Sequence, residues 1–377
     1  MQTVRSHTEI MFKTGRELIA LGGKGTFDLG AAHRRSRWGY ESARISGGTM
    51  TNSRYLAAQV VAGVLLATAA QAETHTFVPT QFYNTYSFAH PPALHIKSGD
   101  RVLTKTIDAE GVDWNGKQVA PRANPETGPF YIDGAEPGDV IVVTLNKLET
   151  NRAMAFSGSL LSPYTTDPTA IAARTDRDPK RLTWTIDKAK GVATLDQTDV
   201  QPGGITLPLR LMLGCIGVAP AFKEAWSTRY PGQFGGNMDY AYMGTGVKLM
   251  LPVNEPGALL FLGDGHARQG EGEVAGTGLE TSMDVDFTVT LIKKKAISWP
   301  RLETATHVMA LGTARPLLEA FQHATAELQQ LLMADYGYTE RGAQTLMGQA
   351  AEYEISNVVD PNFTVVAKVR KDMLPKR

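Results

Sequence analysis

The chain has 377 residues, of which 42% are hydrophobic and 20% charged, so it is long enough to bury a substantial core. Lys and Arg total 38, as do Asp and Glu, and this balance argues against a general nucleic-acid binder or a polybasic membrane-surface protein. The single cysteine, Cys215, excludes an intramolecular disulfide and a four-cysteine zinc site.

The N-terminal region has the pattern of an export signal. A positively charged start follows Met50, the run 56–70 is almost wholly apolar, and an Ala-x-Ala sequence ends at Ala72. The apolar run is shorter than the roughly 20 residues that a membrane span needs. We therefore expect a signal peptide at 50–72, export to the periplasm, and no stable membrane anchor after cleavage. If translation starts at Met50, residues 1–49 are a non-native or disordered extension.

The first part of the mature chain is typical of strands joined by turns. β-branched residues alternate with polar ones, and Gly, Asn, Asp and Pro punctuate the segments between them. A polar connection or lid is predicted at 151–180. The predicted strands are 102–107, 139–148, and a hairpin of 182–186 with 192–195.

The second part continues the strand pattern and then changes to helices. Alternation at 283–292 indicates a half-buried strand, and a 3.6-residue period after Thr304 indicates helices. The remaining predicted elements are an apolar strand region at 205–218, a paired 247–251 and 258–262, helices at 314–336 and from Thr339 to about 353, and a strand at 365–369. The fold class predicted is therefore mainly β with an α+β C-terminal part.

The densest chemical signal is the sequence from Gly263 to Glu273, where a strand ends in a glycine-rich turn. Asp264 and His266 are two residues apart, so an extended backbone places both side chains on one face. A carboxylate and an imidazole are a normal ligand pair for zinc or a similar divalent metal. The alternative is a turn whose acidic residues only bind backbone amides.

Three other motifs carry polar side chains. Gly235–Asp239 reads Gly-Gly-Asn-Met-Asp, 106–113 places three carboxylates after a strand, and 124–139 contains two turns flanking a strand. Each could be a plain turn. Cys215 lies in an apolar context that favours a buried structural thiol over a nucleophile.

Taken in order, these motifs resemble the acetamidase/formamidase family. The stretches that carry the resemblance are 124–139 (NPETGPFYIDGAEPGD), 217–220 (GVAP), 235–239 (GGNMD) and 263–273 (GDGHARQGEGE). The resemblance covers about 75–375 and implies hydrolysis of short aliphatic amides to a carboxylic acid and ammonia. It also implies a β-sandwich-like body and an association with metal ions.

The resemblance also organises the mature chain into parts of one integrated catalytic unit, 73–377. They are an N-terminal β-sandwich part at 73–200, a second β part with the Gly-Asp-x-His motif at 201–304, and an α+β part at 305–377.

The resemblance assigns a divalent metal, which we expect to be zinc, to the Gly-Asp-x-His motif. His266 and Asp264 are the expected ligands, with Asp108 or Asp239 completing the shell. A divalent metal can activate water and polarise the amide carbonyl, two of the three things that amide hydrolysis requires.

The remaining roles fall to other side chains of the same motifs. Glu280 or Glu273 is expected to act as general base and then as proton donor. Asn237 and glycine N–H groups are expected to hold the amide oxygen. The expected partner is a small amide substrate, not nucleic acid, and the protein is expected to be a homo-oligomer. The alternative function is a non-catalytic exported β-sandwich that binds a metal, a sugar or a small amide.

Overall fold

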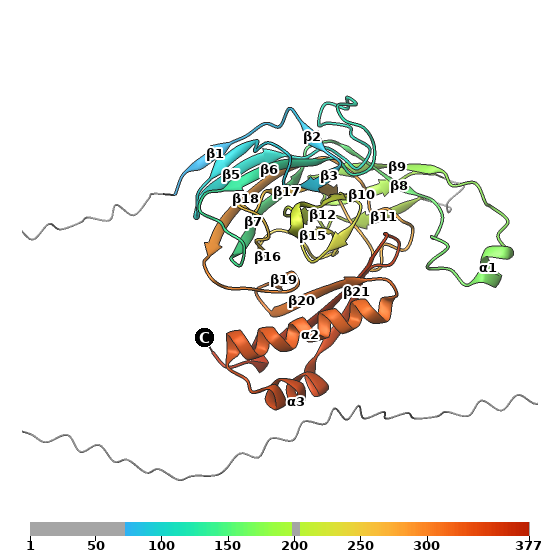
Figure 1. Ribbon diagram of the computed structural model, residues 1–377. Coiled ribbons are helices and arrows are strands. Elements are labelled where there is room, and N and C mark those ends of the chain that lie inside the picture. The colour runs from blue at the N-terminus through green and yellow to red at the C-terminus, as the bar shows by residue number, and fades with distance from the viewer. Residues whose placement is uncertain (1–71, 198–203, 377) are drawn as a thin grey trace, which may run out of the picture. The chain divides into compact units, whose positions relative to one another are not determined.

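The structure, a computed structural model, describes residues 72–197 and 204–376. The expected extension at 1–49 and all but the last residue of the expected signal peptide lie outside the described residues. Within the described residues the largest element is a nine-stranded sheet that joins strands from all parts of the mature chain (Figure 1). Its order is β1 (Thr74–Thr76), β5 (Arg101–Lys105), β18 (Met283–Ile292), β7 (Val140–Thr150), β16 (Lys248–Pro252), β19 (Arg301–Glu303), β20 (His307–Ala314), β22 (Phe363–Arg370) and β21 (Glu352–Asn357).

A second sheet contains seven strands within the same described residues. Six follow the order β14 (Pro231–Gly232), β15 (Gly235–Asn237), β12 (Met212–Gly217), β17 (Leu260–His266), β6 (Glu126–Ile132) and β2 (Phe82–Tyr83), and β4 (Leu94–Ile96) also pairs with β6. The small pair β3 (Thr85–Ser87) and β13 (Ala225–Ser227) is separate.

One hydrophobic core lies between the two large sheets. Leu145 on β7 and Phe287 on β18 belong to the same buried cluster as Ile216 on β12 and Leu262 on β17. Phe130 on β6 packs edge-on against Phe287 with ring centroids 5.2 Å apart. This face-to-face packing of two sheets confirms the predicted sandwich-like body.

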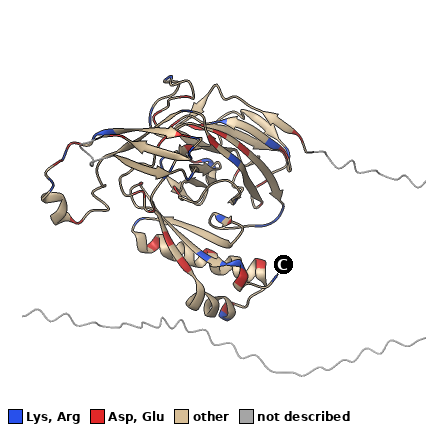
Figure 2. Ribbon diagram, turned by 180° about the vertical axis from the view of Figure 1, so that it is seen from behind, with Lys and Arg blue, Asp and Glu red and all other residues tan. Residues whose placement is uncertain are grey.

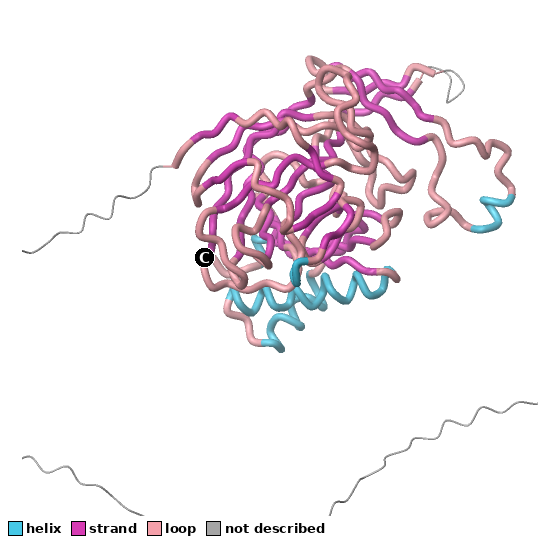
Figure 3. Tube along the Cα trace, turned by 45° about the horizontal axis from the view of Figure 1, so that its top comes forward, coloured by secondary structure: helices cyan, strands magenta, loops and turns pink. Residues whose placement is uncertain are grey.

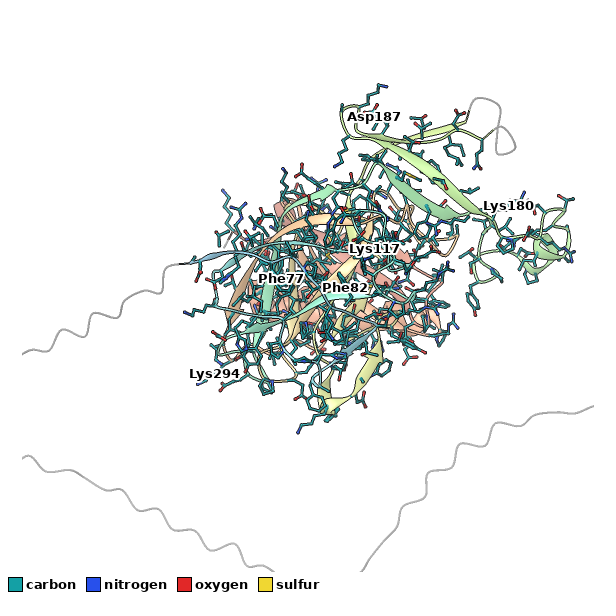
Figure 4. The ribbon with its side chains drawn as sticks, turned by 90° about the horizontal axis from the view of Figure 1, so that it is seen from above. Phe77, Phe82, Lys117, Lys180, Asp187 and Lys294 are labelled. Atoms are coloured by element: carbon teal, nitrogen blue, oxygen red, sulfur yellow. The ribbon has the colours of Figure 1, made fainter. Side chains whose placement is uncertain are left out.

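A four-stranded sheet forms an arm beside the sandwich. Its order is β11 (Ile205–Pro208), β10 (Val192–Leu195), β9 (Arg181–Asp187) and β8 (Met154–Gly158), with α1 (Pro168–Ala172) in the loop before β9. The predicted hairpin through Gly191 is confirmed, because β9 and β10 pair antiparallel there. The segment predicted as a polar connection at 151–180 instead contributes β8 and α1. Figure 4 labels Lys180 and Asp187, which bracket β9 in this arm.

The C-terminal part adds two helices to the nine-stranded sheet, as predicted. α2 (Leu317–Tyr336) packs on β20 and β22, and α3 (Glu340–Ala350) packs against α2. Figure 3 shows these helices beside the strands, and α1 at the end of the arm. The Thr339 hydroxyl caps α3 by accepting from the Gly342 N–H. α3 ends at Ala350, before the predicted 353, because the chain then enters β21.

The predicted pairing of 247–251 with 258–262 is wrong. β16 pairs with β7 and β19, whereas β17 pairs with β12 and β6, so the two strands lie in different sheets. Ala258 and Leu259 both have left-handed backbone, with φ of 56° and 57°. These two residues redirect the chain from one sheet to the other instead of closing a hairpin.

Charged residues of both signs are distributed along the described chain. Figure 2 shows Lys and Arg interspersed with Asp and Glu along the strands and helices. None of the helices in the described residues has the length and hydropathy needed to cross a membrane.

Candidate active site

Four neighbouring strands of the seven-stranded sheet bring the polar motifs of the sequence together. β12 pairs with β15 on one side and with β17 on the other, and β17 pairs with β6. Their polar residues at this place are Glu126 on β6, Cys215 on β12, Asn237 on β15, and Asp264 and His266 on β17. Motifs that are up to about 140 residues apart therefore meet at one place.

His266 is the only imidazole of this cluster among the described residues, and it is fully buried. Its Nε2 atom lies 3.3 Å from Asp264 Oδ1 and 3.1 Å from Glu280 Oε2. Its Nδ1 atom lies 2.9 Å from Gln269 Oε1. Because Gln269 Nε2 donates to the Asp239 carbonyl at 2.6 Å, Oε1 is the side of the amide that faces the ring and accepts the Nδ1 proton.

A second set of carboxyl groups faces the first. The structure places single ligand atoms of Asp239, His266 and Glu273 within 4.8 Å of one another, and does the same for Asp264, His266 and Glu280. All five side chains are buried, and neither carboxylate oxygen of Asp239 has a hydrogen-bond partner. The two sets share only His266, so the cluster has two acidic sides.

Glycines provide the space for these carboxylates. A Cβ atom on Gly214 would collide with both Asp239 Oδ1 and Asp264 Oδ2. A Cβ on Gly263 would collide with Glu126 Oε2, and one on Gly278 with the His266 ring. The glycine-rich character of the motifs therefore has a local cause, the close approach of charged side chains to the backbone.

Three acidic residues of the cluster have left-handed backbone. The φ angles are 53° for Asp264, 46° for Asp239 and 47° for Glu273. Such conformations cost on the order of 1–3 kcal/mol in non-glycine residues and concentrate at functional sites. The left-handed backbone at these residues accompanies the convergence of their carboxylates around His266.

Burial and mutual repulsion set the protonation of the cluster. Burial raises the pKa of Glu280 to about 7, although the neighbouring His266 opposes the shift. Burial and the charges of Asp360 and Asp264 hold the pKa of Asp239 well above its usual range, and burial does the same for Glu273. The cluster thus favours bound positive charge, either protons or a cation.

The pKa values of His266 and Asp264 are shifted in the directions expected of an ion pair. Burial opposes the charge on His266, but Glu280 and Asp264 outweigh it and hold the pKa of the imidazole well above its ordinary value. Burial likewise opposes ionisation of Asp264, yet the charge of His266 lowers the pKa of that carboxyl.

Asn237 has a different environment from the one expected of an oxyanion donor. Its Nδ2 donates to Asp360 Oδ2 at 2.7 Å, and its Oδ1 accepts from Asn124 Nδ2 at 3.1 Å. The Cys215 thiol also lies 2.6 Å from Asn237 Oδ1. Burial raises the pKa of this thiol well above its usual range, so Cys215 is a buried thiol and not a thiolate nucleophile, as its apolar sequence context predicted.

Asp108 lies outside both acidic sets. Its Oδ2 is 2.5 Å from Arg152 Nη2, and its Oδ1 accepts from the backbone N–H groups of Glu110 and Val112. These contacts make it the organiser of the loop that follows β5. The structure brings the other predicted acidic and imidazole side chains together around His266. They are Asp239, Asp264, Glu273 and Glu280.

Two acids of the site were missed in the sequence. Glu126 is fully buried, with neither oxygen hydrogen-bonded, and burial holds its pKa well above the usual range. Asp360 follows β21, in an Asp-Pro turn where a solvated side chain is the usual expectation. The only sequence signal for Glu126 is a charged residue at the start of an apolar strand.

The cluster opens into a small pocket of about 210 Å³. Asp264, Glu273, Glu280 and Asp360 line its polar side, and Phe156 is among its other lining residues. The Arg181 guanidinium lies over the ring of Phe156, 3.8 Å from its centroid, and pairs with Glu110, another lining residue. The pocket can therefore admit a small, largely uncharged molecule to a group of buried carboxylates.

The donors present fit a divalent metal. Nδ1 is bound to Gln269, so Nε2 is the nitrogen that faces the two carboxylate oxygens. A divalent cation bound there would take the place of the Nε2 proton. Asp239 likewise presents two buried oxygens that lack partners. Imidazole nitrogen with carboxylate oxygen is a ligand set that suits zinc and similar ions.

Comparison with known proteins agrees with this site. The profile of the Acetamidase/Formamidase family matches residues 218–375, which include Asn237, the Gly-Asp-x-His motif and Asp360. Formamidase from Methylophilus methylotrophus is 24% identical over 357 residues, covering 75% of this chain and 86% of that protein. A Schizosaccharomyces pombe relative is 25% identical over 276 residues, and the chain spans 64% of its length.

The structural match extends over nearly the whole of a solved relative. The acetamidase from Yersinia enterocolitica superposes with a TM-score of 0.71 at 30% sequence identity, over 82% of this chain and 96% of that one. Shared fold, identity and coverage together place the chain in the acetamidase/formamidase family.

Proposed function

We propose that the protein hydrolyses short aliphatic amides, such as formamide or acetamide, to a carboxylate and ammonia. Family membership supports a hydrolase acting on linear amides. The observation that carries the proposal is the convergence of His266, Asp264 and Glu280 on one small pocket. A small amide fits a pocket of this size, and the polar centre beside it can activate water.

The proposed metal ligands are His266 Nε2 with oxygens of Asp264 and Glu280. These three atoms lie within 4.8 Å of one another, and Gln269 holds the imidazole with Nε2 directed at them. A bound divalent ion, which we propose to be zinc, would polarise the amide carbonyl and lower the pKa of water.

Proton transfer is assigned to a pocket carboxyl outside the two metal-capable sets. Glu273 and Glu280, the sequence-based candidates, belong to those sets, whereas Asp360 lines the pocket without being part of either. Asn237 Nδ2 binds Asp360 Oδ2 at 2.7 Å, and the Asp360 carboxyl would take a proton from water and return it to the departing amine. Asn237 is thus a positioning residue in this scheme.

The size of the pocket supports a short substrate. A cavity of about 210 Å³ holds an amide with a few carbon atoms, and Phe156 with the Arg181–Glu110 pair limits its extension outward. This arrangement favours formamide and acetamide over long acyl chains.

Ammonia release over a panel of short amides tests the proposal. We expect turnover by the purified full chain, loss of turnover after chelator treatment, and recovery on addition of zinc. Binding of a small amide, sugar or metal without ammonia release would instead support the non-catalytic alternative. Full turnover after complete metal removal would reject the metal part alone.

Export and assembly are also part of the proposal. The pattern at 50–72 supports secretion to the periplasm, with cleavage after Ala72. N-terminal sequencing of protein from a periplasmic fraction should start at Glu73, and a start at Met1 would reject it. We further propose a homo-oligomer, which light scattering would distinguish from a monomer.

A further inference from the structure

We propose that Arg229 is the carboxylate-binding residue of the pocket and that it receives the acid product of amide hydrolysis. The inference rests on the proposed amidase function and goes beyond it by assigning a residue to product binding. Within the described parts of the chain, Arg229 is the only basic side chain among the lining residues of the pocket.

Arg229 lies on the turn between β13 and β14, and its backbone is fixed to the site on both sides. The preceding residue, Thr228, is fully buried, and its carbonyl accepts from the Cys215 thiol at 3.5 Å. The carbonyl of the following residue, Tyr230, accepts from the Asn237 N–H at 3.4 Å. The backbone of Arg229 is therefore held beside the strands that carry the site, while its side chain is exposed.

The guanidinium of Arg229 has no ion pair and no side-chain hydrogen bond among residues 72–197 and 204–376. The guanidinium of Arg181, which lies over the lining residue Phe156, is instead neutralised by Glu110. Arg229 thus brings an unneutralised positive charge to the pocket. A carboxylate is the natural partner for such a group, because its two oxygens accept parallel hydrogen bonds from the planar fork of N–H donors.

The reaction creates a carboxylate beside a lining that is otherwise acidic. Hydrolysis of a neutral amide by one water molecule gives a carboxylate anion and an ammonium ion at neutral pH. The acidic side chains of the lining attract the ammonium ion and repel the carboxylate, whereas Arg229 does the reverse. These acids are Glu110, Asp264, Glu273, Glu280 and Asp360. The charges of the pocket therefore favour separation of the two products, with the acid bound at Arg229.

The neutral substrate and the charged product differ in what Arg229 offers them. An uncharged amide gains little Coulomb attraction from the guanidinium, whereas the carboxylate gains both attraction and charge-assisted hydrogen bonds. Because the side chain is exposed, solvent screens the contact and its effect on binding is moderate. Loss of Arg229 should therefore weaken binding of the product more than binding of the substrate.

Inhibition of acetamide hydrolysis by acetate tests the inference, with chloride holding the ionic strength constant. We expect acetate to inhibit the wild-type full chain competitively. In Arg229→Gln the ratio of the acetate Ki to the acetamide KM should rise by about three- to tenfold, because a charge-assisted contact is lost. Arg229→Lys keeps the charge without the planar fork, so its ratio should fall between the other two.

Arg122→Gln is the matched control. Arg122 is exposed and does not line the pocket, yet its segment is joined to that of Arg229. The Asn84 side chain donates to the Arg122 carbonyl at 3.2 Å, and the Thr228 N–H donates to the Asn84 carbonyl at 3.0 Å. The control removes the same charge from a neighbouring segment and should leave the ratio unchanged. An unchanged ratio in Arg229→Gln, an equal rise in both variants, or no inhibition by acetate beyond that of chloride would overturn the inference.

A carboxylate can reach Arg229 from two sources, the product or a substrate whose acyl chain itself ends in a carboxylate. Succinamate and butyramide distinguish them, since a carboxylate in the first replaces the terminal methyl group of the second. A wild-type preference for succinamate that disappears in Arg229→Gln identifies the substrate as a source. A preference for butyramide in both proteins, together with the acetate result, identifies the product alone.

Binding of acetate to the full chain, followed by broadening of its proton NMR signal, does not require turnover. Reduced broadening in Arg229→Gln without ammonia release from any amide would reject the proposed function and leave Arg229 as a carboxylate-binding residue. Ammonia release with an unchanged Ki-to-KM ratio would reject the role of Arg229 and leave the proposed function standing.

Discussion

The His266 imidazole and the Gln269 amide, three residues apart in the chain, are joined by a hydrogen bond of 2.9 Å. The other end of the Gln269 amide donates to the Asp239 carbonyl at 2.6 Å, so the orientation of the amide is fixed. Gln269 therefore selects the ring tautomer whose Nε2 faces Asp264 and Glu280. A partner of this kind sets the direction and basicity of a metal-binding imidazole.

Gln269→Leu removes this hydrogen bond and should weaken zinc binding by about 10- to 100-fold. A competition titration against a chromogenic chelator measures the change. Gln269→Glu keeps an acceptor for the Nδ1 proton but loses the donor to the Asp239 carbonyl, so it should recover only part of the affinity. Gln344→Leu, exposed on α3, is the control. Unchanged affinity in Gln269→Leu would show that packing alone orients the ring.

Gly214→Ala should damage the site more than the fold. The new methyl group would collide with the carboxylate oxygens of Asp239 and Asp264, and overpacking of this kind costs about 1–3 kcal/mol. Because Asp264 is a proposed metal ligand, we expect zinc affinity to fall by about tenfold or more. Gly270→Ala is the matched control, since its Cβ meets nothing within 4 Å. Equal metal affinity in the two variants would contradict the proposed geometry.

Local pattern was sufficient to predict much of the fold. The strand predicted at 283–292 has the bounds of β18, although Asp286 on its polar face is buried, and Thr339 caps α3 as its position indicates. The pairing between strands was harder to predict from the sequence. Nothing in 247–262 reveals that Ala258 and Leu259 carry the chain across the core, because left-handed backbone in such apolar residues has no sequence signature.

The site was predictable where side chains of metal-ligand type are spaced two residues apart along one strand. Asp264 and His266 share one strand end, so their proximity follows from the period of a strand. Asp360 and Glu126 could not be identified from the residues around them, since only tertiary folding brings Glu126 on β6 beside β17 and Asp360 beside Asn237. Asp108 was selected because it is an acidic residue at the end of a strand. Its ion pair with Arg152, 44 residues further along the chain, could not be inferred from the sequence.

Zinc binding should weaken as the pH falls below neutrality. Burial raises the pKa of Glu280 to about 7, so below that pH a proton occupies the carboxylate that would bind the ion. Isothermal titration with zinc across this range should show the apparent affinity falling and more protons released per ion bound. Affinity independent of pH between about 6 and 8 would argue against Glu280 as a ligand.

The metal-free protein should lose stability as the pH rises. The folded state keeps the Glu280 proton up to about pH 7, whereas the unfolded state releases it near the ordinary value of 4.5, so the folded state binds more protons between these values. His266 acts in the same direction, because its raised pKa stabilises the fold only while the ring is protonated. Thermal melts with chelator should show a falling Tm across this window.

Added zinc should reverse that trend, since the ion replaces the lost protons. The rise in Tm caused by zinc should therefore grow with pH. A zinc effect of constant size, or a metal-free Tm that rises with pH, would show that the buried carboxyls are neutralised in some other way.

Phe156→Ala should shift the substrate preference toward longer amides. The Phe156 ring lines the pocket under the Arg181 guanidinium, and its removal opens space where an acyl chain would extend. One methylene in an apolar pocket changes the specificity by about tenfold or more, so the kcat/KM ratio of butyramide to formamide should rise by at least about that factor. Phe321→Ala, on α2 and away from this pocket, should leave the ratio unchanged. If Phe156→Ala folds and the ratio does not change, the acyl group of the substrate does not lie against Phe156. The proposed orientation of the amide toward the polar side chains of the pocket would then be wrong as well.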